Sequence, residues 1–290
     1  MNLSPAIIKE LREKSGAGMM DCKKALDESG GNVEKAIEWL RKKGINTAQK
    51  KSSRSASDGL ITVKIEDNRG VIMEVNAETD FVARNENFQK FCDELALTAL
   101  KNEAENVENL LNCKFLDSNQ KVKENLTNLI SKLGENIVIR KLKYMNDKLG
   151  SFEKYLHNSI NLNSGKIGVL LSFKSNQKTE KVKDFSKNLC MHIAATDPKS
   201  FDIESLDKKL VDKERSIYTE QLKSSNKPDD IIEKIVDGKI KKFYQEVCLL
   251  EQMFVMDNKI KIYDCIAEFN KENNENFEIT NFVIFKLGQE

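Results

Sequence analysis

The 290-residue sequence has no hydrophobic run that approaches the ~20 residues a membrane-spanning helix requires. Residues 1–10 also lack the basic segment followed by an apolar segment that marks a secretory signal peptide. Hydrophobic residues make up 39% of the chain and charged residues 32%, a balance typical of a water-soluble protein with charged helices. We therefore expect a cytoplasmic protein without a membrane partner.

An excess of charge of one sign is absent as well. Lysine and arginine number 47 against 46 aspartates and glutamates, which gives a formal net charge of +1. A chain with this balance has no broad basic surface for the phosphates of nucleic acid, so we expect no direct nucleic-acid partner. The length is sufficient for about two domains.

Motifs for metal, nucleotide and nucleophile chemistry are missing. The six cysteines include no C-x-x-C pair, which favours buried free thiols over disulfides or a zinc site, and no G-x-x-x-x-G-K-[ST] loop occurs. The two histidines, His157 and His192, stand outside metal-ligand spacings. A nucleophilic pair of Cys190 with His192 is a weak alternative, because side chains two residues apart point in different directions. We expect no cofactor, no metal site and no catalytic residues.

The first 46 residues have the pattern of three short helices separated by glycine-containing turns. Gly44 is predicted to close the third helix. A module of this size buries little apolar surface. Met19 and Met20, expected at the tip of the turn before a helix that begins near Asp21, are therefore candidates for docking onto another protein.

Residues 47–58 are predicted to form a linker, because the segment is basic, rich in serine and nearly free of large apolar side chains. Beyond it, apolar residues recur over 61–65 and 71–75 on either side of a turn, which predicts a β-hairpin. Strands joined by hairpins, with helices grouped beside them, favour an α+β fold. The other predicted elements are helices at about 87–102, 119–133, 179–195 and 260–269, and strands at 137–142, near Tyr155, and at 167–173, 253–255 and 277–286.

The second half repeats the element order of the first in outline, although not its residues, so we divide the core into 59–146 and 147–286. Apolar residues recur at helical spacing on both sides of Lys227-Pro228-Asp229, so an antiparallel helical hairpin is expected at about 207–248. Residues 287–290 form a short tail. The charged hairpin leaves the oligomeric state open, since it could pair with a second copy or, as its many lysines favour, stay solvated.

The segment Thr79-Asp80-Phe81-Val82 follows a predicted strand and precedes a predicted helix. Spacing alone favours a structural interpretation, in which Thr79 or Asp80 caps a helical turn and Phe81 and Val82 fill the core beneath it. In the alternative, a loop tip presents an acidic and an aromatic side chain together to a partner.

Five segments occur in an order and with residues that are specific to one family. They are LREKSGAGMMDCKKAL at 11–26, ETDFV at 78–82, GEN at 134–136, MHIAA at 191–195 and KKFYQEV at 241–247. Over nearly its whole length the chain resembles bacterial elongation factor Ts, the family of exchange factors for the GTPase elongation factor Tu. It departs from the family pattern at Ser15 and at Met253, where proline is frequent, and it ends at Glu290 where many members continue into a further helix.

The resemblance implies a ubiquitin-associated-like three-helix module, a core of two related subdomains and an inserted helical hairpin. It also implies that the segment Thr79 to Val82 dislodges Mg²⁺ from elongation factor Tu, with Phe81 as a wedge and Asp80 competing for polar groups near the metal. Met19 and Met20 on the N-terminal module, and His192 on the second subdomain, would dock the partner. A homodimer or a 2:2 complex with elongation factor Tu stays open.

Two alternatives from other functional classes stay open at this point. In one, the chain is a non-enzymatic helical scaffold whose N-terminal module binds peptides or ubiquitin-like proteins. In the other, it is a thiol enzyme that uses one of its cysteines with His192.

Overall fold

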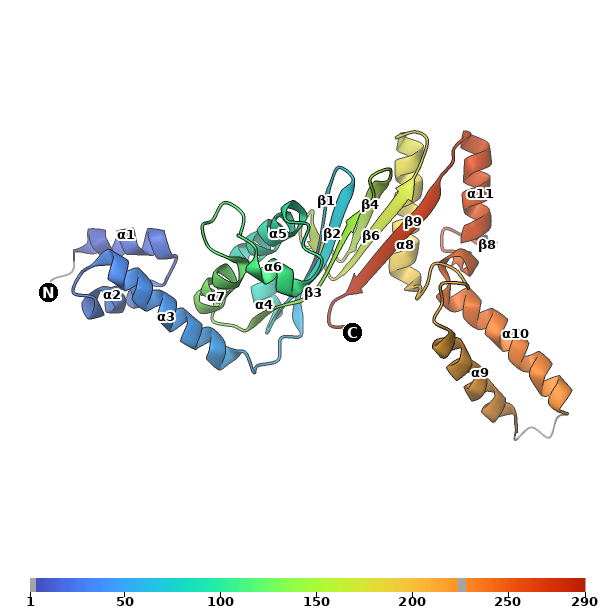
Figure 1. The fold of residues 1–290 in the computed structure, drawn as a ribbon, viewed down its shortest axis with the longest axis horizontal. Coiled ribbons are helices and arrows are strands. Elements are labelled where there is room, and N and C mark those ends of the chain that lie inside the picture. Colours follow the sequence, from blue (N-terminus) through green and yellow to red (C-terminus); the bar gives the residue numbers. More distant parts are fainter. Residues whose placement is uncertain (1–3, 224–227, 290) are drawn as a thin grey trace.

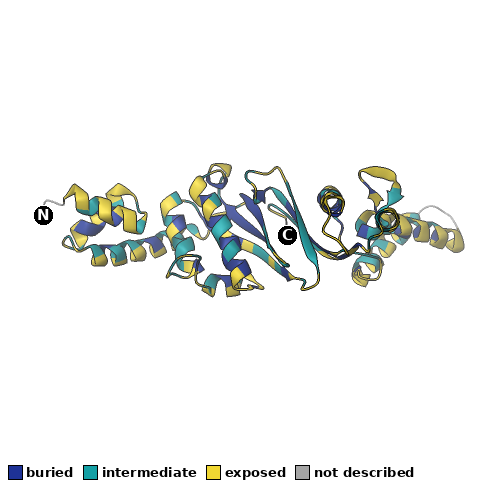
Figure 2. Cartoon of the chain, turned by 90° about the horizontal axis from the view of Figure 1, so that it is seen from above, coloured by how far each residue is buried: buried dark blue, intermediate teal, exposed yellow. Residues whose placement is uncertain are grey.

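The computed structural model describes residues 4–223 and 228–289. A three-helix module lies at one end of the elongated chain, two β-sheets lie in the middle, and a helical hairpin lies at the other end (Figure 1). Buried residues concentrate in the central strands and the helices that cover them, whereas exposed residues dominate the helical hairpin (Figure 2). In the described part of the chain, no helix has the length and apolar character needed to cross a membrane.

The N-terminal module begins as its local sequence predicts. The Ser4 side chain accepts a hydrogen bond from the backbone of Ala6, Gly16 ends the first helix in the left-handed region, and Asn32 caps the third. The small core of the module consists of Leu11, Cys22, Ala25, Leu26 and Ala36. Its helices are α1 (Pro5–Ser15), α2 (Met19–Glu28) and α3 (Val33–Lys51).

Helix α3 does not end at Gly44, as the sequence pattern predicts, but continues to Lys51. Gly44 is buried inside the helix and faces α7 (Val122–Leu133), where the nearest atoms belong to Ser131 and Thr127. The glycine therefore permits close packing of two helices rather than ending one of them. The segment between α3 and the first strand is correspondingly shorter than the predicted linker 47–58.

The first sheet is antiparallel, with strand order β3-β2-β1-β5. One face of it packs against the helices that follow β2, and this core includes Leu60, Met73 and Phe88. The strands are β1 (Asp58–Glu66), β2 (Arg69–Ala77), β3 (Ile137–Asn146) and β5 (Ser164–Gly165). The helices are α4 (Asp80–Ala83), α5 (Glu86–Lys101), α6 (Val107–Asn112) and α7.

The second sheet has the strand order β4-β6-β9, and α8 covers its outer face. The inner faces of the two sheets meet in an apolar layer that includes Ile61, Ile72 and Leu170. A Cβ at Gly168 would lie 2.6 Å from Ile61, so glycine allows this close approach. The elements are β4 (Ser151–His157), β6 (Ile167–Lys174), α8 (Glu180–Thr196) and β9 (Glu278–Lys286).

The predicted helical hairpin is present as α9 (Lys208–Lys223) and α10 (Asp229–Val247), which pack through Ile232, Val236 and Ile240. Lys227 of the predicted turn lies outside the described residues. A short β-hairpin, β7 (Met253–Phe254) and β8 (Asp257–Lys261), then precedes α11 (Ile262–Asn273), which begins later than residue 260. Antiparallel sheets with helices on their outer faces confirm the α+β class.

Candidate partner-binding surface

The segment Thr79 to Val82 forms a capped single turn of helix between β2 and α5. Thr79 has an extended backbone, and its side-chain oxygen accepts a 3.4 Å hydrogen bond from the backbone of Val82. Val82 and Ala83 are buried against the first sheet and belong to its core. The predicted cap and the burial of Val82 are confirmed.

Phe81, in contrast, does not fill the core, and the structural interpretation was wrong for this residue. Its side chain is 81% exposed. Successive residues in a helical turn point in different directions, so burial of Val82 and Ala83 turns Phe81 towards solvent. An exposed aromatic ring at a capped turn is a feature of protein-binding sites.

Asp80 lies beside Phe81 and is also exposed. Its carboxylate is 3.9 Å from the guanidinium of Arg84, and both side chains are more than half exposed. An ion pair of this kind contributes little to stability and breaks easily. The Asp80 carboxylate is therefore free to interact with polar groups of a partner.

Met19 and Met20 form the start of α2 rather than the tip of the preceding turn, because Gly18 is the N-cap. Their exposed fractions are 60% and 75%. Two neighbouring methionines at this exposure give the module an adaptable apolar contact surface.

His192 lies on α8 and is fully buried. Its Nε2 lies 2.9 Å from the side-chain oxygen of Gln252, and its Nδ1 accepts a 3.3 Å hydrogen bond from the backbone of Val255. Burial lowers the pKa of His192, although the hydrogen bond to Gln252 opposes this effect. The neutral imidazole therefore supports the β7–β8 hairpin from beneath and is not itself part of the surface.

The β7–β8 hairpin exposes three apolar side chains next to His192, those of Met253, Val255 and Met256. The sequence pattern predicted a simple strand at 253–255. The apolar run that precedes Asp257 was the signal in the sequence for a surface patch. Apolar runs usually indicate burial, so the patch was not predicted.

The geometry opposes a Cys190–His192 nucleophilic pair. Both side chains are buried, and burial raises the pKa of the Cys190 thiol while it lowers that of His192. These directions are opposite to those that would favour a thiolate and an imidazolium. All six cysteines are free, as the sequence predicts, and four of them are buried.

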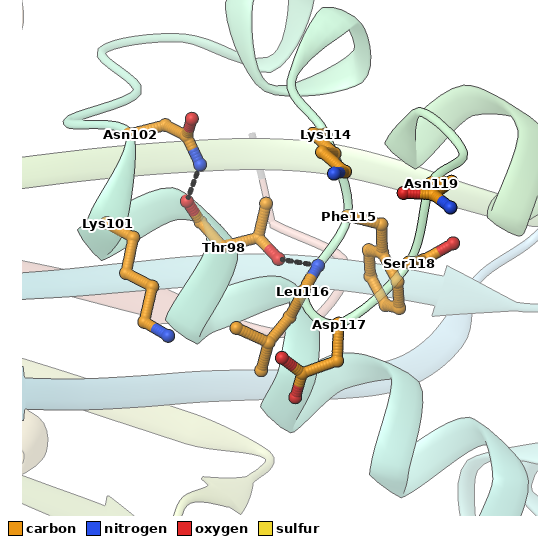
Figure 3. A pocket seen from close by; sticks show the side chains of 9 residues that line it. All are labelled: Thr98, Lys101, Asn102, Lys114, Phe115, Leu116, Asp117, Ser118 and Asn119. Atoms are coloured by element: carbon orange, nitrogen blue, oxygen red, sulfur yellow. Dashed lines mark hydrogen bonds between the residues drawn. The ribbon is translucent and has the colours of Figure 1, made fainter.

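Within residues 4–223 and 228–289, no group of three or more His, Cys, Asp or Glu side chains is arranged to hold a metal ion. A surface hollow of about 420 Å³ lies at the C-terminal end of α5, away from α4 (Figure 3). Two hydrogen bonds join residues of its lining: the Thr98 hydroxyl accepts from the Leu116 backbone, and the Asn102 side chain donates to the Thr98 carbonyl.

Comparisons with known proteins agree with the sequence motifs. The family model described as elongation factor TS matches residues 78–289. Similar curated relatives named elongation factor Ts include those of Rhodospirillum centenum, 44% identical over 99% of this chain and 93% of the relative, and Rickettsia felis, 43% identical over 100% of this chain and 93% of the relative. The relative in Rickettsia bellii is 41% identical over the same shares of the two chains. The chain therefore belongs to the elongation factor Ts family of translation elongation factors.

Proposed function

We propose that the chain promotes release of GDP from elongation factor Tu and so allows GTP to bind again. The observation that carries this proposal is Phe81, an aromatic side chain 81% exposed on a turn whose next two residues, Val82 and Ala83, are buried. Exchange requires no covalent step and therefore no catalytic residue or cofactor on this chain. The burial of Cys190 and His192, which raises the pKa of the thiol and lowers that of the imidazole, is consistent with such a role.

The physical basis is thermodynamic linkage. A GTPase holds its nucleotide through backbone amides and a Mg²⁺ ion that requires near-octahedral oxygen coordination. A protein that binds the nucleotide-free GTPase better than the loaded form must lower nucleotide affinity by the same factor. In this proposal Phe81 is the wedge that displaces elements of the GTPase, and Asp80 competes for polar groups near the partner's Mg²⁺.

Two further surfaces would dock the partner and hold the wedge in place. One is the pair Met19 and Met20 on the N-terminal module, and the other is the β7–β8 hairpin supported by His192. A homodimer or a 2:2 complex stays a prediction. Because bacterial translation takes place in the cytoplasm, the proposed function implies that the protein is located in the cytoplasm.

The test is release of a fluorescent GDP from elongation factor Tu, followed by stopped flow. We expect Phe81→Ala to fold normally and to slow release roughly thirtyfold, as truncation of a binding hot spot does. Leu149→Ala is the matched control, because Leu149 is 85% exposed in the turn between β3 and β4. Release at the wild-type rate by folded Phe81→Ala would refute the wedge. If the wild-type chain fails to accelerate release, the scaffold alternative is favoured.

A further inference from the structure

Strand β2 ends and strand β3 begins at the same edge of the sheet, immediately before the turn that carries Phe81. Their last backbone pair is Ala77 with Ile137. Residues 78–79 follow β2 and residues 135–136 precede β3, and none of these four residues belongs to the sheet. Between these two segments, hydrogen bonds from backbone N–H groups to side chains take the place of backbone–backbone hydrogen bonds.

Glu135 is the first of these side chains. Its Oε2 accepts a 3.1 Å hydrogen bond from the backbone N–H of Thr79, and its Oε1 accepts a 2.7 Å hydrogen bond from the Thr79 hydroxyl. Bonds from neutral donors to a carboxylate are stronger than those between neutral groups. One carboxylate therefore holds both the backbone and the side chain of the residue that caps α4.

Glu78 makes the reciprocal contact. Its Oε1 accepts a 2.6 Å hydrogen bond from the backbone N–H of Asn136, and its Oε2 lies 3.5 Å from Arg54. The side chain of Asn136 donates in turn to the carbonyl of Arg54. The two segments thus clamp each other, and the segment that follows α3 is attached to the same clamp.

The clamp is needed because α4 is too short to hold its own orientation. It has four residues, and an isolated helix of that length is unstable in water. Val82 and Ala83 attach the turn to the sheet from beneath, but Phe81 lies on the opposite, solvent side. A side chain that acts on a partner must be held by supporting residues, since a small displacement removes its effect.

We propose that Glu135 is a positioning residue for Phe81: it fixes Thr79, and through Thr79 the direction of α4. This inference rests on the proposed function for its consequence in nucleotide exchange, but the positioning itself can be measured without the partner. Sequence spacing did not single out Glu135, because it lies 56 residues from Thr79 and the contact depends on the pairing of β2 with β3.

The first measurement is amide hydrogen exchange of the full chain alone. We expect Glu135→Ala to speed exchange in residues 80–85 roughly tenfold or more, because the cap loses two bonds to a charged group, while α5 is unchanged. The charge-neutral Glu135→Gln should shift exchange in the same direction by less and serves if the alanine variant folds poorly. Glu105→Ala is the control, since Glu105 is an exposed glutamate on the same subdomain. Unchanged exchange at 80–85 in both Glu135 variants would overturn the proposal.

The second measurement is a double-mutant cycle in the GDP-release assay. We expect Phe81→Ala to reduce the release rate by a smaller factor in the Glu135→Ala background than in the wild-type background, because a misdirected ring has less effect to lose. If Phe81→Ala reduces the GDP-release rate by the same factor in both backgrounds, Glu135 has no role in nucleotide exchange. A merely structural residue would give that result. If Phe81→Ala has no effect in the wild-type background, the proposed function of Phe81 fails, and hydrogen exchange alone decides the positioning.

Discussion

Gly44 of helix α3 lies against Ser131 of helix α7: a Cβ added to Gly44 would be 3.7 Å from the Ser131 Cβ. An ion pair between Arg41 and Glu124 joins the same two helices nearby. The N-terminal module is therefore packed onto the core by α3 and is not tethered only by a flexible linker. This contact fixes Met19 and Met20 relative to Phe81.

The contact predicts opposite effects for small and large side chains at Gly44. Gly44→Ala should raise the free energy of unfolding by about 0.5–1 kcal/mol, because alanine favours helix and 3.7 Å is an ordinary contact distance. Gly44→Leu should lower it by about 1–3 kcal/mol through overpacking against α7. Urea unfolding followed by the fluorescence of Trp39, the single tryptophan, measures both changes.

Gly238 provides the control for these variants. It lies within α10, and a Cβ there would meet no atom within 4 Å. Both Gly238→Ala and Gly238→Leu should therefore stabilise the chain through helix propensity alone. A stable Gly44→Leu variant with wild-type unfolding would contradict the α3–α7 contact.

Replacing Met19 and Met20 together by aspartate should weaken binding to elongation factor Tu by about 2 kcal/mol or more, the threshold for a hot spot. The fold should persist, because both residues are exposed and acidic side chains are favourable in the first turn of a helix. Calorimetry measures the affinity and far-ultraviolet circular dichroism the fold. Leu149→Asp is the control, and an affinity loss of equal size in that variant would show a general charge effect instead of docking.

The buried His192 predicts a loss of stability on acidification. Burial keeps its pKa below the value of about 6.5 for an unfolded chain, so the unfolded state binds the proton first as the pH falls. This contribution to stability is complete above that pH and decreases below it. Protonation of Nδ1 would also remove the acceptor for the Val255 backbone.

Urea unfolding at several pH values between about 7.5 and 5 tests the predicted loss of stability. This range lies on either side of the ordinary histidine pKa of about 6.5. We expect His192→Gln to make the free energy of unfolding less dependent on pH across this range. His157→Gln should retain the wild-type slope, because His157 is exposed. Identical slopes in all three proteins would show that His192 is not the responsible group.

The cysteines should behave as structural thiols. Burial raises the pKa of Cys190 and Cys248 and also that of Cys113 and Cys265, but the last two side chains are only partly buried and are therefore more accessible to a reagent. An alkylating reagent near neutral pH should modify Cys113 and Cys265 first and leave GDP release unchanged. Mass spectrometry identifies the modified positions. Loss of exchange activity on modification of Cys190 alone would revive the thiol alternative.

Much of the fold was predictable from local patterns. The caps at Ser4 and Asn32, the β1–β2 hairpin and the two helices around Pro228 all depend on residues close together in the chain. Gly44 was misinterpreted for a physical reason: glycine ends many helices, but it also allows two helices to approach closely, and only the position of α7 distinguishes these uses.

The amino-acid sequence alone determined the family, the α+β class and the location of the segment Thr79 to Val82, because motifs, alternation and caps are local properties. Tertiary structure decided which side chains of that segment face outwards, that His192 supports a surface instead of forming it, and that Glu135 holds Thr79. These outcomes depend on the packing of strands and helices distant in sequence, and burial is settled only when those elements meet.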